Sequence, residues 1–298
     1  MAEAENANGL KQMNNLEIKR DSHIVCIKNM IGVFDGVTGA ETVNIVYWDR
    51  SIDNGYDGKQ LIYGADGSSR IAFIPIEDTD IEKPKVIKDI VTRIMSDDIK
   101  SVMSLVTARK PYGFCADPLD NPTKYGINPT DEPIADDDVR LVALNNRRRA
   151  SMYIRRSTLP KESHNLDCYK VFIPKAWGNM SKASGYLGGS YSETIVASPS
   201  DCCSETYVEF GPFETLEQAI SANKYLHTKF FRAMFFYNKK SQNTPRATYS
   251  CIPLQDFSSS SDINWSKSVE DIDSQLYLKY GLSDDEIKFI EQNIQPMD

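Results

Sequence analysis

This chain has few histidines and cysteines that could bind a metal or form disulfides. Its 298 residues include three histidines and six cysteines, and no two cysteines have the C-x-x-C spacing of zinc sites. We therefore expect free thiols in a reducing compartment. No apolar run approaches the roughly 18 residues of a membrane span, and the start, MAEAENANGLKQ, lacks the apolar core of a signal peptide. The sequence predicts a cytoplasmic protein that does not bind membranes.

Motifs for cofactor chemistry are also missing. The Asn-Pro and Asp-Pro pairs lack the second proline and the aromatic residue with which DNA adenine methyltransferases hold a flipped base. No Gly-Lys-Ser/Thr nucleotide-binding motif occurs, and the early glycines lie between strands with no helix following. We therefore predict no catalytic residue, no metal and no cofactor for this chain.

A nuclease of the common restriction type needs an acidic residue upstream of a Glu-x-Lys triplet to hold Mg²⁺. Glu17-Ile18-Lys19 follows no aspartate, and Glu286-Ile287-Lys288 falls in a predicted helix, where alternate residues do not share a face. Both triplets are interpreted as chance matches. A restriction endonuclease with an active site of another pattern stays open as an alternative function.

The net charge is −8, but the basic residues concentrate in two segments. Residues 140–182 hold ten Lys or Arg against two acids, and residues 224–250 hold six and no acid. A basic face on an acidic chain is what binding to a polyanion requires. Charge alone is equally consistent with two solvated segments that happen to be basic.

The spacing of apolar residues and turns predicts an α+β fold, with a small antiparallel sheet subdomain and a mixed α/β recognition subdomain with C-terminal helices. A flexible N-terminus (1–20) precedes a β-rich subdomain with one helix (21–111). An acidic, proline-rich loop (112–138) then leads to the recognition subdomain (139–298). The predicted strands are His23–Ile27, Thr42–Trp48, Gln60–Tyr63, Arg70–Ile74, Arg140–Leu144, Ser151–Ile154, Tyr169–Ile173 and Thr206–Phe210.

Helices are predicted over 84–96, 216–238 and 283–294. Pro84 suits the first helical turn because its missing N–H is not needed there. Thr215 with Gln218, and Ser283 with Glu286, have the spacing of capping boxes. Four phenylalanines of the long helix have a spacing that favours a core role over base stacking: Phe230, Phe231, Phe235 and Phe236.

The segment Tyr169–Gly178, YKVFIPKAWG, closely resembles part of the C-terminal region of bacterial N6-adenine DNA methyltransferases from type II restriction–modification systems. Thr228–Arg232, Thr248–Phe257 and the closing run Leu276–Asp298 are similar to the same region. The resemblance covers roughly residues 20–298, and the catalytic half of those enzymes is absent from this chain.

This resemblance implies the target recognition domain of such an enzyme, which grips the duplex while the catalytic domain flips the adenine. It implies two partners: double-stranded DNA, and a methyltransferase catalytic domain or chain that carries out the DNA methylation. S-adenosylmethionine would bind that missing half. The expectation is a sequence-specific DNA-binding module, and a protein-interaction fragment is the other alternative.

On this interpretation twelve residues of the two basic segments are candidates for DNA contacts. Arginines that flank a short strand reach phosphates or a guanine edge, and the lysines and a tryptophan lie in or beside polar loops. A glutamine in the loop after the long helix is a candidate adenine reader. The set is Arg147, Arg148, Arg149, Arg155, Arg156, Lys175, Trp177, Lys182, Lys239, Lys240, Gln242 and Arg246.

Overall fold

A computed structural model describes four strands of the first part of the chain and most of the remainder. The described segments are 22–28, 42–48, 59–63, 69–73, 85–95, 99–175, 193–239 and 244–297. The predicted flexible N-terminus, residues 1–20, lies outside them. Contacts divide the chain into one compact unit of Met1–Lys85, Asn179–Gly185 and Lys240–Gln242, and a second of Val86–Gly178, Tyr186–Lys239 and Asn243–Asp298.

The first unit contains a four-stranded sheet in the order β2-β1-β3-β4. All four predicted strands are present: β1 (Ser22–Lys28), β2 (Thr42–Trp48), β3 (Lys59–Tyr63) and β4 (Ser69–Phe73). The expected antiparallel arrangement is wrong for one pair, because β1 and β3 run parallel. β2 and β3 pair with opposite edges of β1, β2 antiparallel to it and β3 parallel to it.

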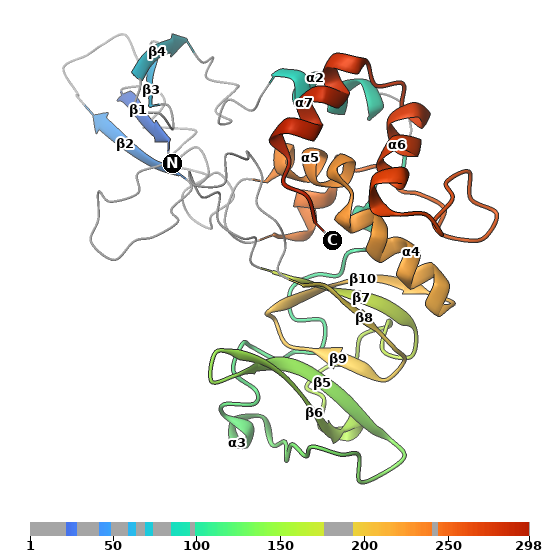
Figure 1. The fold of residues 1–298 in the computed structure, drawn as a ribbon. Coiled ribbons are helices and arrows are strands. Elements are labelled where there is room, and N and C mark those ends of the chain that lie inside the picture. Colours follow the sequence, from blue (N-terminus) through green and yellow to red (C-terminus); the bar gives the residue numbers. More distant parts are fainter. Residues whose placement is uncertain are drawn as a thin grey trace. The chain divides into compact units, whose positions relative to one another are not determined.

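One sheet of the second unit is antiparallel throughout and has the order β10-β7-β8. Its strands are β7 (Tyr169–Pro174), β8 (Ile195–Ala197) and β10 (Tyr207–Phe213). The α4 helix contacts all three strands, and Figure 1 shows it beside this sheet. The two longer strands confirm the predictions, whereas β8 is too short for its residue pattern to be recognised.

The other sheet of the second unit, in the order β6-β5-β9, lies beyond the first one when seen from the helices (Figure 1). Here β5 (Asp138–Asn145) pairs antiparallel with β6 (Arg148–Arg155) and parallel with β9 (Asp201–Cys203). The β5–β6 hairpin extends past both predicted strands, so only two residues separate them.

The acidic loop, residues 112–138, packs into the second unit. Tyr112, Phe114 and Leu119 are buried in the same apolar cluster as Leu141 of β5. A single helical turn, α3 (Pro122–Tyr125), interrupts the loop. The loop's apolar side chains therefore fix the path of a segment whose composition is mostly polar.

A buried carboxylate joins several of these elements. Glu209 of β10 is fully buried, and its carboxylate accepts the Tyr112 hydroxyl at 2.5 Å and the Ser163 hydroxyl at 2.9 Å. The Glu209 backbone N–H donates to Thr107 Oγ1 at 3.1 Å, and the Tyr112 hydroxyl lies 3.3 Å from the Asp201 carbonyl oxygen on β9. Burial raises the pKa of Glu209. The network connects both sheets of this unit with the acidic loop.

The helices of the described segments follow local signals. Thr215 caps α4 by accepting the Gln218 N–H, and Ser283 and Glu286 form the predicted capping box of α7. None of these helices combines the length and apolar character that a bilayer crossing requires. The longer helices are α2 (Lys85–Ile94), α4 (Leu216–His227), α5 (Lys229–Asn238), α6 (Val269–Lys279) and α7 (Asp284–Asn293), and the 3-10 turns are η3 (Val102–Leu105), η4 (Arg156–Thr158) and η5 (Arg246–Tyr249).

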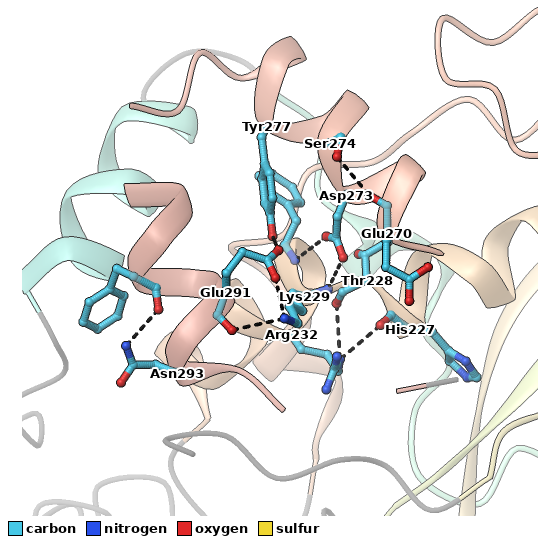
Figure 2. A network of polar contacts seen from close by, with 12 residues as sticks. His227, Thr228, Lys229, Arg232, Glu270, Asp273, Ser274, Tyr277, Glu291 and Asn293 are labelled. Atoms are coloured by element: carbon cyan, nitrogen blue, oxygen red, sulfur yellow. Dashed lines mark hydrogen bonds and ion pairs between the residues drawn. The ribbon is translucent and has the colours of Figure 1, made fainter. Parts of the chain in front are cut away.

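The prediction of one continuous helix over 216–238 is wrong, because α4 and α5 meet at Thr228. The Thr228 hydroxyl accepts the Phe231 N–H at 3.1 Å. Asp273 of α6 points at the same place and accepts the N–H groups of Lys229 and Phe230, each at 2.8 Å (Figure 2). The first N–H groups of a helix have no partner within it, so these acceptors stabilise a new helix start.

The α5 helix is apolar on most of its surface. The four phenylalanines expected in the core are all buried, which confirms that prediction: Phe230, Phe231, Phe235 and Phe236. At its start, Lys229 forms an ion pair with Glu291 of α7, which also accepts the Tyr277 hydroxyl at 2.8 Å (Figure 2). Polar contacts thus join α5, α6 and α7 around one helix end.

Asp273 makes the stability of this unit pH-dependent. Burial and the nearby Glu291 raise its pKa to about 7, although the two N–H donors and Arg232 act in the opposite direction. An unfolded aspartate has a pKa near 3.9, so the folded chain binds the extra proton. The free energy of unfolding should therefore fall as pH rises from about 4 to about 7, by at most about 1.4 kcal/mol per unit.

The measurement is urea unfolding of the wild type and Asp273→Asn between pH 4 and 7. Asparagine does not titrate, so the free energy of unfolding of the wild type should fall relative to that of the variant as pH rises. A difference that stays constant over this range would contradict the assignment.

Candidate nucleic-acid interface

The turn of the β5–β6 hairpin brings three candidate arginines together. Asn145 and Arg148 form the last pair of the ladder, and Asn146 and Arg147 make the two-residue turn between them. Both turn residues have positive φ, 50° and 63°, which is the conformation of a type I′ turn. Arg147, Arg148 and Arg149 are all exposed. We call residues 145–149 the hairpin tip.

Contacts with other segments support the hairpin tip. Asp120 Oδ1 of the acidic loop accepts the Asn146 N–H at 2.7 Å. The Arg149 guanidinium donates to the Glu193 carbonyl oxygen at 2.8 Å and lies 5.8 Å from the centre of the Tyr207 ring. One contact thus engages the backbone of the turn, and the other engages a side chain that follows it.

Two arginines of the hairpin tip keep their full hydrogen-bonding capacity. Within the described part of the chain, no hydrogen bond or ion pair engages the guanidinium of Arg147 or Arg148. A guanidinium offers five N–H donors in a planar fork that matches a phosphate or a guanine edge. Both groups are thus available to a ligand.

The arginines at the opposite end of β6 are neutralised locally. Arg155 lies 3.3 Å from Asp137, and Arg156 pairs with Glu162 at 2.7 Å and with Asp167 at 2.8 Å. The Arg156 guanidinium lowers the pKa of Asp167. From Arg148 to Arg155 the strand rises by about 24 Å, so these two arginines lie far from the hairpin tip.

Two more cations of the 140–182 segment serve the fold. Arg140 forms a bidentate pair with Asp201, at 2.8 and 2.5 Å. Lys170 is fully buried and donates to three backbone carbonyl oxygens at 2.9 to 3.1 Å, and burial lowers its pKa. Partners within the fold therefore engage several of the cations in this segment.

The second basic segment, 224–250, presents no continuous cationic face among the described residues. Lys224 donates to the carbonyl oxygens of Trp265 and Lys267, and Lys229 pairs with Glu291. Two more cations of this segment, Arg232 and Lys239, are buried. Arg246 donates to the Met103 carbonyl oxygen. Carbonyl groups at helix ends and loops account for most of these cations.

The remaining candidates lie at the ends of the described segments or outside them. Lys175 is half-buried at the end of β7, where its backbone bonds to residues 206 and 244. Four candidates lie outside the described residues: Trp177, Lys182, Lys240 and Gln242. The structure thus brings Arg147, Arg148 and Arg149 into one exposed group and separates them from Arg155 and Arg156.

Sequence reasoning missed the asparagines of the hairpin tip. Asn145 is half-buried and Asn146 is exposed, and the Asn146 amide donates to Asn145 Oδ1 at 3.0 Å. An Asn pair followed by arginines and lacking a glycine is a weak turn signal. Asparagine tolerates positive φ better than most residues, which makes Asn146 suitable for this position.

No protein-family model matches this chain, and no curated protein matches it. In the described segments, no group of three or more His, Cys, Asp or Glu side chains has the arrangement of a metal site.

Arg147 should limit the stability of the hairpin. A left-handed conformation costs a residue with a Cβ roughly 1–2 kcal/mol, and glycine recovers this at an entropic cost of roughly 0.5–1 kcal/mol. We expect Arg147→Gly to raise the free energy of unfolding by about 0.5–1 kcal/mol in denaturant titrations. Arg148→Gly is the matched control and should lower it, because β6 starts at Arg148 with ordinary strand geometry. Equal effects of the two changes would refute this account.

Proposed function

We propose that this chain is a sequence-specific duplex-DNA-binding module that inserts the hairpin tip into the major groove. The observation that carries the proposal is the exposed Arg147–Arg148 pair at the end of a two-stranded ribbon, with Arg147 at φ 63°. A strained side chain that the fold keeps in place is a reason to look for function there.

The dimensions and chemistry of the tip suit this ligand. The major groove of B-DNA is about 12 Å wide and admits a two-stranded ribbon. Arginine makes bidentate bonds to guanine, and asparagine makes them to adenine. The hairpin tip carries both residue types within five positions, so it is able to contact base edges as well as phosphates.

We further propose that the module is the target recognition part of a restriction–modification N6-adenine methyltransferase whose catalytic half is a separate domain or chain. This proposal rests on the resemblance of Tyr169–Gly178 and of the closing run, and on the lack of a methyl-donor loop in the sequence. The catalytic half would supply S-adenosylmethionine binding and base flipping.

The direct test is selection of duplexes from a random-sequence library by the full chain, followed by anisotropy titration with the enriched and a scrambled 30-bp duplex. A module of this kind enriches one motif and binds it at least about a thousandfold more tightly than the scrambled duplex. Recovery of no motif would overturn sequence-specific binding.

The arginines of the hairpin tip should account for the salt dependence of binding. Replacing Arg147 and Arg148 by Gln removes two unpaired cations, so affinity should fall and the slope of log K against log salt should decrease by up to about 1.8. The matched control is the double variant Arg155→Gln, Arg156→Gln, whose charges already face acids. It should leave the slope nearly unchanged. A larger effect from the control would show that the surface is misplaced.

Asp120 should oppose DNA binding while it supports the turn. Its carboxylate lies beside the hairpin tip, where it repels phosphates, and its Oδ1 holds the Asn146 N–H. Asp120→Asn keeps the acceptor oxygen and removes the charge. We expect a severalfold gain in affinity that shrinks as salt is raised, because exposed charges are screened. Unchanged or weaker binding at 50 mM salt would argue against insertion of the tip.

A further inference from the structure

The outer edge of β6 carries backbone groups that the sheet does not use. At Tyr153, the N–H and the carbonyl oxygen bond to Thr130 of the acidic loop, at 2.8 and 2.9 Å. On β5, the Arg140 N–H donates to the Ser200 carbonyl oxygen, and the Val142 carbonyl oxygen accepts the Ser204 N–H. These two β5 residues therefore turn their backbone groups towards β9. The two pairs that they form with β6 are therefore non-hydrogen-bonded pairs.

Ser151 is the partner of Val142 in this ladder. Its N–H and carbonyl oxygen consequently point away from β5, to the same side as the groups of Tyr153. Thr130 covers that side only at Tyr153. Ser151 is exposed, and no described residue bonds to its backbone N–H or its hydroxyl. One residue thus presents two unused donors at the open edge of the hairpin.

The distance of Ser151 from the turn matches the depth of a DNA groove. Ser151 lies three positions after Arg148 in the strand, a rise of about 10 Å. The major groove is about 8.5 Å deep. A tip that touches base edges on the groove floor therefore holds Ser151 at the rim, where the phosphates lie.

We propose that Ser151 binds a DNA phosphate through its outward N–H and its hydroxyl, an inference that rests on the proposed function. Charge favours this occupant, because unpaired cations at Arg147 and Arg148 lie at the same end of the hairpin. Serine hydroxyls and backbone N–H groups are common phosphate donors in protein–DNA complexes. The contact fixes how deep the tip inserts, and it leaves base choice to the tip.

The test compares the wild type with Ser151→Pro and Ser151→Ala in anisotropy titrations with the enriched 30-bp duplex from the selection. Proline removes the outward N–H without breaking the ladder to β5, and an edge strand tolerates it there. Alanine removes the hydroxyl alone. We expect a loss of about tenfold for proline and about threefold for alanine. The salt slope should not change, because neither donor is a cation.

Wild-type affinity for Ser151→Pro, together with a normal thermal transition, would overturn the inference and leave the proposed function intact. Failure of the wild type to bind the duplex would instead overturn the proposed function. If the proline variant does not fold, hydrogen exchange of the wild-type Ser151 amide decides: protection on adding duplex supports the contact, and unchanged exchange overturns it. Competition by polyglutamate as strong as by duplex would also overturn it, since binding would then depend on negative charge in general and not on a DNA phosphate.

Discussion

The hydrogen bonds of Glu209 are the constraint on which the rest of the second unit depends. A carboxylate removed from water destabilises the fold by several kcal/mol unless donors surround it. Tyr112 and Ser163 supply those donors from segments far from β10 in the sequence. Neither segment has freedom to move without leaving Glu209 unsatisfied. The relation between the two sheets, and with it the base of the β5–β6 hairpin, follows from this requirement.

The distribution of charge follows a similar logic. Most cations in the two basic segments lie on strands and helices that pack against other elements, where acids and carbonyl groups engage them. The turn of a hairpin is different, because it projects beyond the neighbouring strands. Arg147 and Arg148 remain unpaired among the described residues for this reason. The hairpin turn therefore places two adjacent guanidinium groups in solvent.

Local signals in the sequence predicted much of the fold. The capping box of Ser283 and Glu286 involves residues three positions apart, and the strand patterns of β1 to β4 are equally local. The break at Thr228 was not predictable in this way, because its cause includes Asp273, more than forty residues further along the chain. The α+β class was therefore predictable, whereas the helix break and the parallel pairing of β1 with β3 were not.

The candidate site, too, was only partly predictable from the sequence. The arginine run was visible in the sequence, but its position in a turn was not, since Asn146-Arg147 lacks the glycine typical of type I′ turns. Ion pairs such as Arg140–Asp201 join residues on different strands. Which arginines remain available therefore depends on the tertiary structure.

The bridge between Thr130 and Tyr153 also bears on how the protein behaves at high concentration. Exposed edge strands with long runs of unused backbone groups promote aggregation by pairing with other chains. β6 has eight residues, but the bridge occupies its outer groups at Tyr153, and arginines flank the remainder. A second copy of the strand would meet both the bridge and like charges. The edge accordingly resists intermolecular strand pairing while Ser151 stays accessible.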